Sequence, residues 1–233
     1  MIKGLKTRVR KALRYGPKSL EKRLLAQRSY AQEGEDRLLL RYFGLKKDGF
    51  YVDVGAHHPY RFSNTQLFYE MGWSGINIDA MPGSMAPFRR ARRRDVNLEQ
   101  GVGEAAATAR FFVFNETALN TFDEATARKH DVLPWKIERV VEIPVEPLRD
   151  ILAKHLPEGR KIDFLSIDVE GRDLDVLRSN DWGKYRPEVV LAESLHKTLD
   201  DLADDPSANF LRSVGYVPYA KTVNTFVFIE GEK

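Results

Sequence analysis

The stretch Phe50-Tyr51-Val52-Asp53-Val54-Gly55-Ala56-His57-His58-Pro59 decides the fold of this chain. Residues 50–54 mix apolar and β-branched side chains with one acid, which is typical of a strand buried on both faces of a parallel sheet. Gly55 allows a sharp turn and the close approach of a ligand, and Pro59 suits the first turn of a following helix. Because an acid is costly to bury without partners, we expect Asp53 to face a crevice at the carboxyl end of this strand. The alternative is an ordinary strand–helix turn with a capping Asp.

Three later stretches repeat the pattern of a buried strand that ends in an acid. The strand at 75–80 ends near Asp79, the strand at 161–167 runs into Asp168 and Glu170, and the strand at 188–193 ends in Glu193. The carboxyl ends of parallel strands meet at one edge of an open α/β sheet, so these acids should line one crevice. Asp79, at the end of the second strand, can accept hydrogen bonds from both ribose hydroxyls of a nucleoside. Its alternative role is that of an acid at a helix N-terminus.

The remaining pattern predicts an α/β chain with helices between the strands. We expect helices over 61–71, 82–94 and 147–155, a third strand over 96–103, further strands over 110–114 and 140–145, and a final antiparallel pair over 216–219 and 225–229. The polar residues 115–126 are long enough for a lid or a binding loop. The arginines of 89–94 are typical of a solvated helix face. Glu33, Glu35 and Gln32 either favour the N-terminus of the next helix or line the site.

Charge divides the chain into two parts. Residues 1–28 carry ten Lys or Arg and one acid, a net charge of +9, whereas the rest carries 27 basic and 33 acidic residues, a net charge of −6. We therefore expect a basic amphipathic N-terminal arm, 1–28, and one catalytic domain, 29–233. The arm either lies on an anionic membrane surface or packs its narrow apolar stripe on the body or on a second subunit. The acidic body argues against a nucleic-acid partner.

The absence of cysteine excludes disulfides, a thiol nucleophile and thiolate metal ligands. It fits a reducing compartment, and no secretory signal or membrane span is visible in the sequence. We expect a cytoplasmic protein, with contact at the inner membrane face if the arm binds lipid.

An acid-rich crevice limits the cofactors that fit it. The chain has no Walker loop and no GxGxxG run, the usual cradles for nucleotide phosphates. Carboxylates would repel a polyphosphate and would suit a cationic nucleoside. S-adenosylmethionine carries both a sulfonium and an ammonium group and is therefore the expected cofactor.

Four runs, FYVDVGAHHPYRFSNT (50–65), GINIDAMPG (75–83), NLEQGVG (97–103) and IDFLSIDVEGRDLDVL (162–177), resemble the FkbM family of S-adenosylmethionine-dependent O-methyltransferases. The resemblance spans roughly residues 29–230. It implies a Rossmann-like seven-stranded sheet, mostly parallel with an antiparallel last strand, and helices on both faces. It also implies methyl transfer to a hydroxyl, often on a sugar of a polysaccharide, a glycolipid or a glycosylated natural product.

The motifs of the family assign roles to individual residues. Asp53 and Gly55 match the cofactor loop, Asp79 the ribose acid and Val102 the adenine wall, and Asp168 and Glu170 match an acidic pair near the methyl-transfer site. The candidate cofactor-binding residues are Gln32, Asp53, Gly55, Ala56, Asp79, Ala80, Val102 and Asp168. The candidate substrate-binding residues are Asn64, Asn120, Glu193 and His196. Many members carry a Gly- or Asn-containing turn where this chain has His57-His58-Pro59.

A sugar hydroxyl is a poor acid, so a base or a metal should assist the reaction. The candidate catalytic residues are His57, His58, Asp168 and Glu170. Each His has an alternative, structural role in capping or hydrogen bonding. Mg²⁺ on Asp168, Glu170 and Glu193 is a further alternative, since hard oxygen ligands suit it. Two other functions stay open: an NAD-dependent sugar oxidoreductase and a non-catalytic binding module on the same fold.

Overall fold

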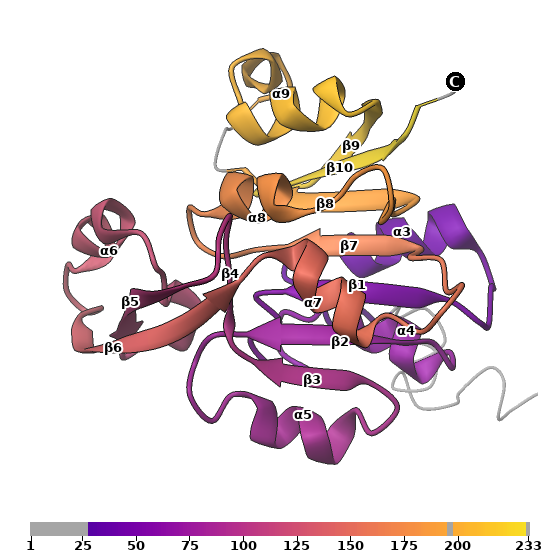
Figure 1. Ribbon diagram of the computed structural model, residues 1–233. Helices are drawn as coiled ribbons and strands as arrows, with labels where there is room; N and C mark the ends of the chain where they lie inside the picture. The colour runs from indigo at the N-terminus through magenta and orange to yellow at the C-terminus, as the bar shows by residue number, and fades with distance from the viewer. Residues whose placement is uncertain (1–27, 195–197, 232–233) are drawn as a thin grey trace, which may run out of the picture.

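A seven-stranded β-sheet forms the centre of the molecule (Figure 1). The computed structural model describes residues 28–194 and 198–231. The first five strands in spatial order run parallel, and β10 runs antiparallel between β8 and β9. In that order the strands are β3 (Val96–Glu99), β2 (Ser74–Asp79), β1 (Phe50–Val54), β7 (Phe164–Ile167), β8 (Val189–Glu193), β10 (Thr225–Glu230) and β9 (Tyr216–Lys221). This order confirms the predicted mostly parallel sheet whose last strand in sequence is antiparallel.

Strand β1 lies in the middle of the sheet and is buried over its whole length. Val52 is in register with Ile76 of β2 on one side and with Leu165 of β7 on the other. Burying each such side chain contributes on the order of 1.5–3 kcal/mol, so a strand covered on both faces needs apolar residues at successive positions. The apolar run in the sequence therefore places β1, and the turn that follows it, at the centre of the fold.

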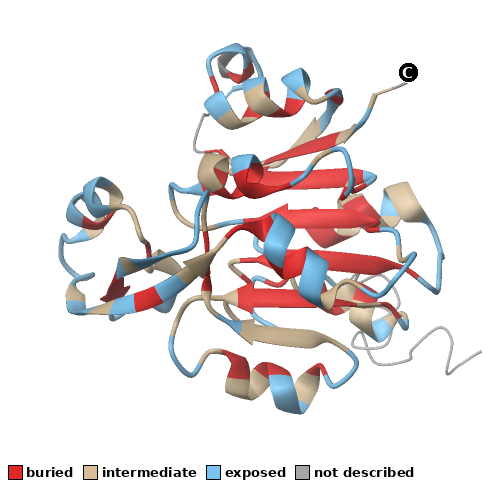
Figure 2. Ribbon diagram, viewed as in Figure 1, coloured by how far each residue is buried: buried red, intermediate tan, exposed pale blue. Residues whose placement is uncertain are grey.

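Helices cover both faces of the sheet (Figures 1 and 2). The helices α7, α8 and α9 pack on one face, and α3 and α4 pack on the other. A further helix, α5, lies beside the edge strand β3. Their bounds are α3 Glu35–Phe43, α4 Gln66–Glu70, α5 Met85–Ala91, α7 Leu148–His155, α8 Asp173–Ser179 and α9 Pro206–Ser213. Figure 2 shows the strands as a buried layer between these helices, as the fold class requires.

A smaller sheet of three strands stands beside the carboxyl ends of the main sheet (Figure 1). It consists of β4 (Gly101–Val102), β6 (Ile137–Glu146) and β5 (Ala107–Phe114), with β6 in the middle. The single strand expected over 96–103 is therefore wrong, because β3 ends at Glu99 and β4 pairs with β6. A Cβ at Gly101 would lie 2.7 Å from the Phe122 ring, so the glycine allows this second sheet to close.

The polar stretch at 115–126 contains more regular structure than the expected loop. A short 3₁₀ helix, η1 (Thr117–Leu119), lies within it, and α6 (Glu124–His130) begins before its end. Asp123 caps α6 by accepting a hydrogen bond from the Thr126 N–H at 2.7 Å. These short elements hold the segment against β5 rather than leaving it as an open loop.

Two helices are shorter than predicted. The helix expected over 61–71 begins only at Gln66, since Phe62 has a φ of 56°, which a right-handed helix excludes. The helix expected over 82–94 ends at Ala91, and Arg92 is fully buried instead of solvated. The Arg92 guanidinium donates to the Tyr51 hydroxyl at 3.0 Å and to the Pro59 carbonyl at 2.9 Å. It thereby ties the loop after β1 to the strand itself.

Two predicted features fall outside the described part of the chain. The basic arm at 1–28 is described only at its last residue, and His196 belongs to the undescribed segment 195–197. Among the residues that are described, no helix is both long and apolar enough to cross a membrane.

Candidate active site

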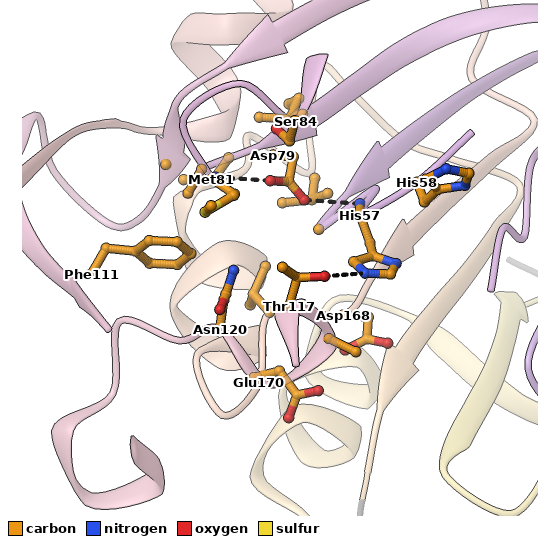
Figure 3. Close-up of a pocket in the computed structure, with 18 of the residues that line it drawn as sticks. His57, His58, Asp79, Met81, Ser84, Phe111, Thr117, Asn120, Asp168 and Glu170 are labelled. Atoms are coloured by element: carbon orange, nitrogen blue, oxygen red, sulfur yellow. Dashed lines mark hydrogen bonds between the residues drawn. The ribbon is translucent and has the colours of Figure 1, made fainter. Parts of the chain in front are cut away.

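A cavity of about 420 Å³ opens where β1, β2 and β7 end (Figure 3). Its walls combine apolar side chains from the main sheet with others from the second sheet, and a small number of polar groups converge on it. The apolar walls are Val54, Ile78, Met81, Val102, Phe111 and Phe122. A pocket of this size and composition is typical of a small-molecule site.

The turn after β1 brings the two central strand ends into direct contact. Gly55 has a φ of 85°, and a Cβ there would lie 1.7 Å from the Asp168 carbonyl oxygen. Only glycine fits this position, because any side chain would collide with the backbone at the end of β7. The close contact fixes the loop at 55–58 beside the acids that follow β7.

Asp79 connects the ends of β1 and β2 at one wall of the cavity (Figure 3). Its Oδ2 accepts a hydrogen bond from the His57 N–H, and its Oδ1 accepts one from the Met81 N–H, both at 2.8 Å. Burial raises the pKa of the Asp79 carboxyl, and these two N–H groups oppose the rise. Since each carboxylate oxygen has a second lone pair, Asp79 can still accept bonds from a ligand. Its role as the ribose acid stays a prediction.

His57 is held in the cavity wall in a left-handed conformation, with a φ of 52°. Its Nε2 lies 3.0 Å from the Thr117 hydroxyl oxygen. Its Nδ1 is buried and has no hydrogen-bond partner among the described residues. Burial lowers the pKa of the imidazole, which is therefore neutral near pH 7 and able to accept a proton.

His58 has a different environment. Its Nδ1 accepts hydrogen bonds from the Tyr60 and Arg61 N–H groups, both at 3.1 Å. A ring nitrogen that accepts from backbone N–H groups carries no proton, so in the neutral ring Nε2 holds the hydrogen. Burial, followed by the Arg61 charge, lowers the pKa of His58. This geometry favours the structural alternative, a turn cap, for His58.

Three acids stand together where β7 and β8 end. Asp168, Glu170 and Glu193 each offer an oxygen within 4.8 Å of the others. Desolvation is the first cause of the rise in the pKa of all three, to about 6 for Asp168, about 8 for Glu170 and about 10 for Glu193, and neighbouring carboxylates add to it. Asp168 is an exposed residue, and the solvent that reaches it is that of the cavity. At neutral pH Asp168 is thus the acid among the three that is mostly ionised and can accept a proton.

The structure brings most of the predicted site residues to one cavity. Those that line it are Gln32, Gly55, His57, His58, Asp79, Ala80, Val102, Asn120, Asp168 and Glu170. Four others do not line it. The Asp53 carboxylate is buried and accepts from the Thr65 hydroxyl at 3.1 Å, and Asn64 donates to the Ser166 hydroxyl at 3.1 Å. Ala56 packs with Met85 and Phe88, and Glu193 adjoins the acids.

Other lining residues were not singled out from the sequence. Phe111 of β5 and Phe122 form a ring pair 4.6 Å apart that packs with Ala80 and Met81, next to Asp79, and closes this part of the wall. The aromatic run at 111–114 was a signal for a buried strand but not for this cavity. Thr117, which contacts His57, had no sequence signal, since η1 reaches the site only through the pairing of β5 with β6.

A family model described as the methyltransferase FkbM domain matches residues 53–218. Searched against curated proteins, the sequence matches none of them. The matched range contains all four strand ends that carry the acids described above.

Solved methyltransferase structures also resemble this chain. The methyltransferase FkbM from Methylobacillus flagellatus KT is 15% identical, with a TM-score of 0.48, and the match covers 84% of this chain and 47% of that one. This chain thus spans about half the length of that protein. A precorrin-6y C5,15-methyltransferase from Geobacter metallireducens GS-15 is 12% identical (TM-score 0.46; 89% and 93% covered). An O-methyltransferase from Bacillus cereus, in complex with SAH, is 11% identical (TM-score 0.41; 88% and 83% covered). Identities this low bear on the fold alone.

Proposed function

Because the chain belongs to the FkbM methyltransferase family, we propose that it is an S-adenosylmethionine-dependent O-methyltransferase whose acceptor is a sugar hydroxyl of a polysaccharide, a glycolipid or a glycosylated natural product. One observation carries the proposal. The cavity has an apolar wall beside Asp79 at one side and the ionisable pair Asp168 and Glu170 at another. A nucleoside that ends in cationic groups matches both sides.

The residues present fit this cofactor. Asp79 has free acceptor capacity for a ribose diol, and Val102 and Phe111 offer flat apolar surface for a base. Asp168 supplies negative potential for the sulfonium and ammonium groups, and a bound cation would favour ionisation of Glu170 beside it. A dinucleotide would instead have to place its pyrophosphate against these carboxylates, which disfavours the oxidoreductase alternative.

The chain's own residues then orient the acceptor and remove its proton. The bound cofactor supplies a methyl group that is activated by its sulfonium. The cavity aligns the acceptor hydroxyl with that methyl group and excludes water, and such positioning supplies much of the acceleration. Asp168, ionised and open to the cavity, accepts the hydroxyl proton in this proposal. His57 is the alternative acceptor, through its Nε2 beside Thr117.

A transfer assay tests the proposal directly. The full chain is incubated with methyl-labelled S-adenosylmethionine and a panel of nucleotide sugars, lipid-linked glycans and free glycosides, and the products are tested for the stability of a methyl ether to acid and base. Calorimetry with S-adenosylhomocysteine and with NAD runs beside it. We expect the first ligand to bind, NAD not to bind, and label to enter one class of glycan. Binding of NAD alone, or transfer to an amine instead of a hydroxyl, would contradict the proposal.

We also propose that the basic arm holds the protein at an anionic membrane surface on the cytoplasmic side, where lipid-linked glycans are met. The support is the net charge of +9 on residues 1–28 against −6 on the rest. Each Lys or Arg near such a surface contributes on the order of 1 kcal/mol, and salt screens the attraction. Binding to anionic vesicles should therefore be lost at high salt and after deletion of residues 1–28. If the deletion changes the oligomeric state instead, the arm is a packing element.

A further inference from the structure

Three carboxylates stand together at the ends of β7 and β8, and a fourth belongs to the start of the following helix. Asp168, Glu170 and Glu193 each offer an oxygen within 4.8 Å of the others, and Asp173 is the first residue of α8. The charges that act most strongly on these four groups, among the residues the structure describes, all come from other carboxylates. An isolated cluster of buried like charges is costly, so it requires protons or a cation.

Asp173 gives independent evidence that the cluster binds a cation and is not stabilised by protons alone. The residue is 5% exposed, and its Oδ1 is buried with no hydrogen-bond partner among the described residues. The rest of its carboxylate accepts hydrogen bonds from backbone N–H groups, among them those of Val169 and Glu193. Because Val169 and Glu193 stand at the ends of β7 and β8, these backbone contacts place the Asp173 carboxylate next to the three acids, and its charge helps to raise the pKa of Glu170 and Glu193. An unpartnered, buried carboxylate oxygen is rare in folded proteins and points to a missing positive group.

The spacing of the oxygens fits a hard divalent cation. Two oxygens on opposite sides of such an ion lie about 4.2 Å apart for Mg²⁺ and about 5 Å apart for Ca²⁺, twice the metal–oxygen distance. The 4.8 Å limit on the three carboxylates lies within this range after small side-chain movements. Carboxylates alone, without nitrogen or sulfur ligands, favour Mg²⁺, Mn²⁺ or Ca²⁺ over Zn²⁺.

We propose that Asp168, Glu170 and Glu193 bind one hard divalent cation, with Asp173 as the fourth negative group beside it. The binding does not depend on the function proposed above. If that function holds, the ion would lie at the acidic wall of the cavity, since Asp168 and Glu170 line it. There it would lower the pKa of an acceptor hydroxyl and share in its deprotonation.

Metal binding can be measured without cofactor or substrate, so its failure would leave the proposed methyl transfer standing. The full chain is treated with EDTA, desalted and titrated with MnCl₂, with free Mn²⁺ followed by electron paramagnetic resonance. We expect one saturable ion per chain and competition by Mg²⁺. Glu193→Gln should weaken Mn²⁺ binding by roughly 100-fold and Asp173→Asn by roughly tenfold.

The control for both variants is Asp175→Asn, on the same helix as Asp173. Asp175 forms a surface ion pair with Arg172 at 3.0 Å, so its replacement should leave Mn²⁺ affinity unchanged. Because burial and neighbouring carboxylates keep Glu193 protonated at neutral pH when no cation is bound, Glu193→Gln should fold as well as the wild type. Glu170→Gln serves as a second ligand variant. Absence of saturable binding in the wild type, or equal affinity in Glu193→Gln, Glu170→Gln and the wild type, would overturn the proposal.

Discussion

Arg61 and Glu116 join the loop after β1 to the segment before η1 by a two-point contact, Nη1 to Oε1 at 3.1 Å and Nη2 to Oε2 at 3.2 Å. The two segments are 55 residues apart in the sequence and both border the cavity. The Arg61 hydrogen bond is the first cause of the lowered pKa of Glu116. The contact therefore links two separate walls of the cavity.

Breaking this contact should loosen the site more than it destabilises the protein. Both side chains are partly exposed, so Arg61→Ala should change the free energy of unfolding by less than about 1 kcal/mol. The affinity for S-adenosylhomocysteine should fall by roughly two- to fivefold, because the walls are no longer linked. Calorimetry and urea unfolding measure the two effects. Glu124→Gln, which removes ion pairs with Arg128 of α6 and Arg110 of β5 that do not line the cavity, is the control and should leave affinity unchanged.

Asp79 should determine whether the protein distinguishes a ligand with a ribose diol from one that lacks the 2′-hydroxyl. Asp79→Ala is expected to weaken binding of S-adenosylhomocysteine by about 1.5–3 kcal/mol, since hydrogen bonds to a charged group are lost. Because Asp79 also accepts from two backbone N–H groups, weaker binding alone would not prove the contact. The sharper measurement compares the ligand with its 2′-deoxy analogue. The wild type should discriminate between them and the variant should not; equal discrimination in both proteins would refute the assignment.

Asp168 should affect turnover far more than cofactor affinity. Asp168→Asn is expected to reduce kcat by roughly 10²–10⁴-fold, the usual contribution of a general base. The affinity for S-adenosylhomocysteine should fall far less, since that ligand loses only the attraction of one carboxylate for its ammonium group. Without added divalent cation, the wild-type kcat should rise with pH through about 6, as the Asp168 carboxyl loses its proton. His57→Gln is the comparison. If it abolishes turnover and Asp168→Asn does not, His57 is the base.

Asp53 should make the protein less stable as the pH rises. Burial raises the pKa of this carboxyl to about 7, against 3.8 for its ordinary value. A carboxyl with a raised folded-state pKa holds its proton better in the folded chain, so stability is lost as the pH rises from about 4 through about 7. Asp53→Asn should remove this loss, a difference of up to about 4 kcal/mol above pH 8. Urea unfolding of both proteins between about pH 5 and 9 measures it; parallel curves would show that Asp53 does not titrate in this range.

The central sheet could be predicted because each of its strands can be recognised from its own short stretch of sequence. The apolar run that ends at Val54 and is followed by Gly55 is typical of a buried strand and of few other structures. The same holds for the strand before Asp168. The rule that parallel strands end at one edge then brings Asp79 and Asp168 to one cavity. A strand that is buried on both faces needs apolar residues at successive positions, and that signal is present within each short stretch.

What the sequence could not reveal depends on long-range pairing. Nothing local separates Glu99 from Gly101, yet the chain changes sheets between them, because β4 finds its partner some 40 residues later in β6. Thr117 reaches His57 only through that second sheet. Arg92 looked like one of several surface arginines, and its burial depends on acceptors at Tyr51 and Pro59, which no helical pattern encodes.

The contact of Gly55 with the Asp168 backbone also limits where substitutions could adapt this protein to other acceptors. With no room for even a methyl group there, the junction of β1 and β7 cannot be widened by point substitution. Other parts of the cavity wall are built from side chains, among them Asn120 and Phe122. Libraries aimed at new acceptors should therefore vary Asn120 and Phe122 and leave Gly55 and Phe111 untouched, so that the cofactor keeps its place while the rest of the cavity changes shape.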